Sequence, residues 1–230
     1  MKPSIIQNER QSTGHLTSRF MSQVYLVMGL CLLLSATMAY SIASNPYLAR
    51  AIIGSSGLYF ALIIAQLICV VAFRKVMATC SSTTTFSLLA VYSLLSGATL
   101  SVIAFAYTMD SIVQTFAICT ASFIGLSAVG FITKRDLSPI GSFCTMGLIG
   151  LIILSVASFI FPALRADHIQ LALSAAGVLI FSGLTAYDTQ KIKSMYDPAA
   201  PKELQNKMVL SGALTLYLVL QLLRLMGRRR

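Results

Sequence analysis

The chain consists of long apolar runs separated by short polar segments. A helix crosses a hydrocarbon core of about 30 Å with roughly 20 residues. None of the six longer runs alternates with the period of two that is typical of barrel strands. The pattern predicts an all-α polytopic membrane protein with seven transmembrane helices. The runs lie at residues 21–43, 51–73, 84–107, 111–132, 142–163, 169–187 and 208–226.

The sequence predicts a membrane domain at residues 21–226, with one polar tail before it and another after it along the chain. Residues 1–20 form a polar tail without a convincing cleavage site, so we expect the first helix to be retained. Residues 227–230 form a basic tail. The last run is apolar for only about 16 residues before Arg224. It either crosses fully or is a re-entrant or centrally buried helix, in which Gln221 and Arg224 face protein or water; alternatively, Arg224 extends to the interface.

Composition supports a bilayer environment. Hydrophobic residues make up 57% of the 230 residues and charged residues 10%, with a mean hydropathy of +0.81. These values lie outside the balance of a soluble domain.

The basic residues are distributed unevenly between the two sides of the predicted spans. With a cytoplasmic N-terminus, the outer loops hold only Arg50 and Arg165, which fits the positive-inside rule. The net charge of +10 is therefore a topology signal with some attraction to anionic lipid. Nucleic-acid binding is not predicted, because the basic residues form no stripe with aromatic residues. The inner side holds Lys2, Arg10, Arg19, Arg74, Lys75, Lys134, Arg135, Lys191, Lys193, Lys202 and Lys207.

The sequence predicts no enzyme, cofactor or dedicated metal site. The two histidines, His15 and His168, have no companion at helical spacing, and the five cysteines show no CxxC spacing. P-loop, GxSxG and HExxH motifs are absent.

One carboxylate, Asp188, follows nineteen residues without a charge. The helix that carries it can continue to about Tyr196, because the first breaker is Pro198. Asp188 would then lie about 12 Å inside the cytoplasmic end of that helix. It is interpreted as a structural ion pair, a functional ion or proton site, or a solvated interfacial residue. The candidate cations are Lys191, three residues further, and Arg74, at the end of the second span.

Three segments resemble the Bax inhibitor-1 family, in particular its bacterial branch. GLTAYDTQKIK at 183–193 is similar to the family's YDTQ signature, and TKRDLS at 133–138 to its loop after the fourth helix. GALTLYL at 212–218, followed by LLRLMG, is similar to its seventh helix.

The resemblance implies a seven-helix bundle with a central seventh helix, in the bacterial inner membrane. Members are described as pH-sensitive calcium-leak channels, and in bacteria also as modulators of a membrane-bound AAA protease. Their proposed pH sensor is a pair of aspartates with a competing arginine from the second helix. Asp188 matches the first aspartate, and Arg74 matches the arginine.

The chain departs from the family pattern after Tyr217-Leu218. The family has its second aspartate there, whereas this chain has Val219 and reaches LLRLMG about five or six residues early. Two neighbouring carboxylates can share a proton or a divalent ion. A single Asp188 beside Arg74 is expected to remain ionised and paired.

Two functions are therefore expected. The first is a pH-modulated calcium or cation leak channel gated by ion pairing of Asp188, which is also a candidate calcium contact. The alternative is a regulatory protein that binds a membrane protease or another membrane partner through its cytoplasmic tail and loops. The glycines and small residues at 121–130 and 141–150 allow close helix contacts, within the bundle or with such a partner.

Overall fold

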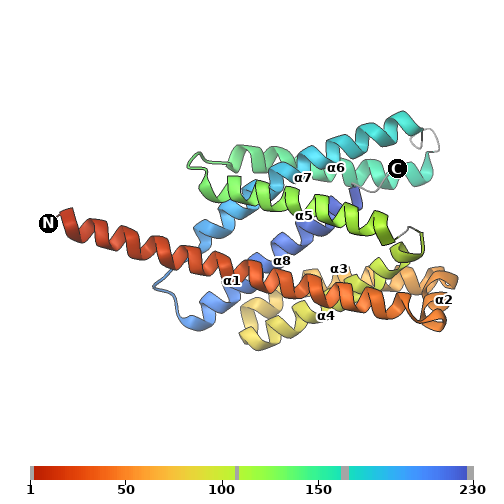
Figure 1. The fold of residues 1–230 in the computed structure, drawn as a ribbon, viewed down its shortest axis with the longest axis horizontal. Helices are drawn as coiled ribbons and strands as arrows, with labels where there is room; N and C mark the ends of the chain where they lie inside the picture. Colours follow the sequence, from red (N-terminus) through yellow and green to blue (C-terminus); the bar gives the residue numbers. More distant parts are fainter. Residues whose placement is uncertain (1–2, 107–108, 162–165, 227–230) are drawn as a thin grey trace. The chain divides into compact units, whose positions relative to one another are not determined.

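The computed structural model describes residues 3–106, 109–161 and 166–226, and within these ranges the chain is helical without a strand (Figure 1). This confirms the predicted all-α class. The helices are α1 (Pro3–Ala43), α2 (Pro46–Gly54), α3 (Ser56–Thr79), α4 (Ser82–Ala106), α5 (Met109–Ile132), α6 (Ser138–Ile160), α7 (Asp167–Met195) and α8 (Lys202–Met226).

Five helices contain stretches that are long and apolar enough to cross a membrane. They are His15–Ala43, Gly57–Thr79, Ser82–Val102, Ser138–Ser155 and His168–Met195, and Phe116–Ile132 is a shorter apolar helix. The protein is thus a polytopic membrane protein. The last predicted run lies in α8, whose side chains are described only to Gln221, so a full crossing by this run stays a prediction.

At the start of the chain, the prediction of one helix at 51–73 was wrong. The run at 51–73 is not one helix, because Ser55 ends α2 and its hydroxyl caps α3 by accepting a hydrogen bond from the Leu58 amide. Arg50 lies in α2 and not in a loop; the Asn45 side chain caps this helix and Pro46 follows. The polar residues 3–20 continue α1, whose 41 residues span about 60 Å.

The chain divides into two compact units. The first comprises residues 1–112 and 195–214, and the second residues 113–194 and 215–230. Helix α8 therefore contributes its first half to one unit and its second half to the other.

In the first unit, α1 and α4 pack closely. A Cβ added at Gly97 would collide with the Ser35 backbone, so the absence of a side chain allows this approach. The Gln66 side chain of α3 donates a hydrogen bond to the Thr99 hydroxyl of α4 at 3.2 Å and accepts one from Ser96 at 3.3 Å. Gln66 therefore joins α3 to α4 by side-chain hydrogen bonds.

The α7–α8 linker is held by the first unit. The ring of Tyr196 stacks on buried Phe20 of α1, with ring centroids 4.8 Å apart. At the start of α8, the Glu203 carboxylate accepts hydrogen bonds from the backbone amide and the hydroxyl of Ser82, in the first turn of α4. These hydrogen bonds hold the pKa of Glu203 below its usual value.

The second unit is centred on α5, α6 and the long α7 (Figure 1). Phe181 and Leu184 of α7 form an apolar core with Cys119 of α5 and Cys144 of α6. Gly147 and Gly183 bring α6 and α7 close together, since a Cβ at either position would meet a side chain of the other helix. Within the segment 141–150, Gly147 and Cys144 therefore pack against α7 of the same unit.

Candidate functional site

Asp188 lies inside α7, as predicted. The helix ends at Met195, one residue before the predicted end, so seven further residues or about 10 Å of helix follow the carboxylate. It belongs to the apolar stretch His168–Met195, which is long enough to cross a membrane. The functional candidate is therefore a carboxylate in the helix interior.

One row of residues along α7 that includes Asp188 is otherwise buried and apolar. Leu184 and Ile192 lie one turn before and after Asp188, and both are less than 7% exposed. Phe181, two turns before it, is fully buried, whereas Asp188 is half-buried. A carboxylate in such a row is costly unless a cation, a proton or water compensates it.

The face of α7 nearly opposite Asp188 contacts α5. A Cβ at Gly130 of α5 would collide with the Ala186 carbonyl, so the two helix backbones approach closely. Three residues further along α7, the hydroxyls of Thr189 and Ser127 form a buried hydrogen bond of 2.8 Å. These contacts fix the rotation of α7 about its axis at the height of Asp188.

Gln190 joins α7 to the loop between α5 and α6. Its side-chain amide donates hydrogen bonds to the carbonyls of Thr133 at 3.3 Å and Arg135 at 2.8 Å. Its side-chain oxygen accepts one from the Leu137 amide at 2.9 Å. Gln190 of the YDTQ motif therefore binds the TKRDLS loop directly, although the two motifs are far apart in sequence.

Side chains bind at the end of α5 and just before α6. The Lys193 ammonium donates a hydrogen bond of 2.7 Å to the Phe131 carbonyl in the last turn of α5 and lies 4.5 Å from the centroid of the Phe131 ring. Asp136 accepts hydrogen bonds from the hydroxyl and the backbone amide of Ser138, the first residue of α6. Both bonds lower the pKa of Asp136. Asp136 therefore makes a local contact within the loop that leads into α6.

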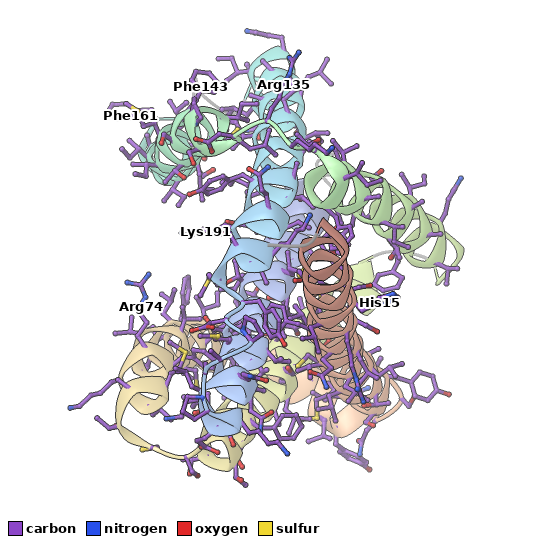
Figure 2. All side chains as sticks on the ribbon, turned by 90° about the vertical axis from the view of Figure 1, so that its left-hand side faces the viewer. His15, Arg74, Arg135, Phe143, Phe161 and Lys191 are labelled. Atoms are coloured by element: carbon purple, nitrogen blue, oxygen red, sulfur yellow. The ribbon has the colours of Figure 1, made fainter. Side chains whose placement is uncertain are left out.

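Lys191 lies on the exposed side of α7 (Figure 2). Its ammonium is 5.7 Å from the centroid of the Tyr187 ring, and its charge acts favourably on Asp188 through space. Tyr187 in turn packs where Gly141 of α6 leaves room for its ring. Within the described part of the second unit, no hydrogen bond or direct ion pair of the Asp188 carboxylate is found.

The other predicted site residues lie elsewhere. Arg74 is exposed near the end of α3 in the first unit (Figure 2), so its pairing with Asp188 of the second unit stays a prediction. Gln221 donates a hydrogen bond of 3.0 Å to the hydroxyl of Tyr217 on the previous turn of α8. The side chain of Arg224, Arg165 and the tail at 227–230 lie outside the described residues.

Sequence reasoning assigned no structural role to Thr189, Gln190 or Lys193. With Ala186, they occupy one face of α7 at helical spacing. That periodicity was a usable signal, because polar residues in line with a small residue are typical of a helix–helix contact. Within the described ranges, no three His, Cys, Asp or Glu side chains form a cluster that could hold a metal ion.

Comparison with known proteins gives consistent matches over nearly the whole chain. The family model described as inhibitor of apoptosis-promoting Bax1 matches residues 17–230. The inner membrane protein YbhL of Escherichia coli K12 is 38% identical, over 92% of each chain. A protein of Borreliella burgdorferi is 38% identical over 93% of each chain. A membrane protein of Streptococcus pyogenes serotype M6 is 31% identical over 92% of this chain and 93% of its own.

Proposed function

Since the chain belongs to the Bax inhibitor-1 family, we propose that it is a cation leak channel of the bacterial inner membrane, modulated by pH through Asp188. Calcium is the proposed permeant ion, and Asp188 is its candidate contact. The observation that carries the proposal is the half-buried carboxylate in an otherwise buried apolar row of a helix long enough to cross the membrane. Ionisable groups at such positions mark ion or proton pathways in membrane proteins.

The proposed gate is the ionisation of Asp188. The ionised carboxylate attracts Arg74 at the end of α3, and this pair holds the pathway closed. Protonation removes the negative charge and therefore the attraction, so the leak increases as pH falls. Because the second carboxylate of the family pattern is missing, the gate of this chain depends on one carboxylate and one arginine.

Calcium flux into proteoliposomes at a series of pH values tests the gate. Asp188→Asn resembles the protonated form, so we expect a raised leak that no longer depends on pH. Asp197→Asn is the matched control, because Asp197 is exposed beyond the end of α7 and an asparagine oxygen can still accept its hydrogen bond from the Ala199 amide. Equal flux through the wild type and Asp188→Asn at every pH would contradict the proposal.

Arg74→Gln separates the ion pair from a calcium contact. Loss of the pair alone predicts a raised leak that resembles that of Asp188→Asn. If Asp188 instead acts only by binding calcium, Asp188→Asn lowers the flux and Arg74→Gln leaves it unchanged.

The length of α1 favours a second candidate function, binding of a membrane protease or another membrane partner. Its 41 residues are about twice the number needed to cross the hydrocarbon core, so the polar first part extends beyond the bilayer as a helix. From the excess of basic residues on that side, we place this part in the cytoplasm.

Removing residues 2–14 tests this function, because Phe20 and its contact with Tyr196 remain. Co-purification of a protease with the intact chain but not with the shortened one supports a role of the extension. Removing residues 227–230 is the control. Unchanged co-purification after the N-terminal deletion would exclude the extension as the binding element.

A further inference from the structure

The loop between α5 and α6 carries two exposed basic residues, Lys134 and Arg135. The carboxylate between this pair and α6, Asp136, is engaged by the amide and hydroxyl of Ser138. In the part of the chain that the structure describes, neither Lys134 nor Arg135 is paired with a carboxylate. The loop therefore presents a positive charge that its own acidic residue does not cover.

Apolar helix flanks the loop directly on both sides. The shorter apolar helix Phe116–Ile132 ends just before it, and the apolar stretch Ser138–Ser155 begins directly after it. Only five residues separate the two, so a bilayer around these helices would bring the basic side chains to the depth of the lipid phosphate groups. An anionic phospholipid fits this position in charge and in depth, whereas a soluble anion would require no such position.

The backbone of the loop is held in place. The side chain of Gln190 binds the carbonyls of Thr133 and Arg135, which flank Lys134, together with the Leu137 amide. A ligand of the two basic side chains meets a preorganised loop and loses less entropy on binding. Gln190 is two residues from Asp188, so its hydrogen bonds join the loop to the helix that carries this carboxylate.

We propose that the loop at 133–137 binds the phosphate groups of anionic phospholipids, and that Gln190 couples this binding to the half of α7 that contains Asp188. Lipid binding stabilises the loop in the conformation that Gln190 recognises, and thereby holds the end of α7. The effect on ion leak rests on the proposed function above, but the lipid binding and the coupling to α7 do not.

Hydrogen–deuterium exchange in phosphatidylcholine nanodiscs tests the binding, with short-chain phosphatidylglycerol as the titrant. We expect slower exchange of the amides at 133–141 as the titrant is added. The double variant Lys134→Gln/Arg135→Gln should weaken the response, by roughly fivefold in apparent affinity for each lost charge and about 25-fold in total.

The matched control is Lys75→Gln/Lys202→Gln, which removes two exposed charges elsewhere and should leave the midpoint of the titration unchanged. An equal response of both double variants, or protection by inorganic phosphate alone, would overturn the lipid site. Protection by an acidic peptide but not by the lipid would also overturn it, because the partner would then be a protein.

Gln190→Met tests the coupling. In the wild type, the anionic lipid should also slow amide exchange at 187–195 in α7. In the variant, the lipid should still slow exchange in the loop but should leave exchange in α7 unchanged. Gln190→Glu keeps the acceptor for the Leu137 amide and should restore part of the α7 response. An α7 response that persists in Gln190→Met would refute the coupling.

Flux measurements on the same samples separate this inference from the proposed function. The anionic lipid should lower the leak of the wild type and not that of Gln190→Met. If exchange follows the expected pattern while no leak is measurable in any sample, the lipid site stands and the channel function fails.

Discussion

The two units of the chain contain the same two kinds of stabilising contact. Each has a glycine that lets two helix backbones approach, Gly97 in the first unit and Gly130 in the second. Each also has a glutamine that joins two elements by several hydrogen bonds, Gln66 in the first unit and Gln190 in the second.

The difference lies in the elements that the glutamines join. Gln66 exchanges hydrogen bonds with two hydroxyls inside the apolar part of α4 and also donates to the Leu95 carbonyl of that helix, so it fixes one helix against another. Gln190 binds backbone groups of the loop at the end of α5, so it fixes a helix to a connection. The bonds of Gln66 hold two helices in a fixed position against each other. The bonds of Gln190 connect an exposed loop to the helix that carries Asp188.

The glycines should give the largest effect. Because a Cβ at either position meets backbone atoms that cannot move aside, Gly97→Ala and Gly130→Ala should each lower the free energy of unfolding by about 3 kcal/mol. Gly125 of α5 has no such atom within 4 Å, so Gly125→Ala should instead raise it by about 0.5–1 kcal/mol. Unfolding in detergent measures all three, and equal effects of Gly125→Ala and Gly130→Ala would remove the close approach as the cause.

The glutamines should differ from each other. Gln190→Met leaves two carbonyls and an amide of the loop without their partner, so we expect a loss of about 2 kcal/mol. Gln66→Met should cost about 1 kcal/mol or less, because hydroxyls in a membrane helix can bond to their own backbone, as Thr99 does. The same unfolding assay measures both losses of free energy, and a larger loss for Gln66→Met than for Gln190→Met would reverse the comparison.

The hydroxyl contacts should contribute less and about equally in both units. Ser127→Ala removes one partner of the Thr189 hydroxyl, and Ser96→Ala removes a donor to Gln66. Both should cost about 0.6 kcal/mol, the average for polar contacts between membrane helices. Double-mutant cycles with Thr189→Val and Gln66→Met measure each contact, and a coupling near zero would show that the hydroxyl is dispensable.

The smallest effect concerns the contact between the first turns of α8 and α4 in the first unit, between Glu203 and Ser82. The pKa of Glu203 is lowered in the folded protein, so its contribution to stability is present above the unfolded pKa of about 4.3 and is lost as pH falls through the folded value. Gln190 has no proton to gain, so its contact should not change with pH. Glu203→Gln should therefore flatten the acid side of the stability profile slightly, and Gln190→Met should leave its shape unchanged.

Much of the fold followed from the sequence because apolar runs of membrane length are hard to mistake. The end of α7 was predicted within one residue, since Pro198 is a strong breaker. The break at Ser55 was missed because its neighbours are apolar enough to hide a capping residue inside a run. The extension of α1 was missed because polarity determines where a helix leaves the membrane, and not where the helix ends.

The candidate site was predictable only in part. Asp188 stands out because charge is rare in an apolar run, and its position in the helix follows from spacing. The partners of Gln190 are more than 50 residues away in sequence, and its contacts are mostly with backbone groups, which leave no trace in residue type. Pairing of Asp188 with Arg74 remains a prediction, because it depends on side chains from both units.

The division of α8 between the units bears on how the protein is made. Residues 1–112 are synthesised before residues 113–194, but their unit also includes residues 195–214, which leave the ribosome only after most of the second unit. The early helices can therefore enter the membrane in order, whereas neither unit can reach its final packing before its segment at 195–214 or 215–230 has been synthesised. A nascent chain stalled before residue 195 should accordingly remain a substrate for membrane quality control, even though most of its spans are already inserted.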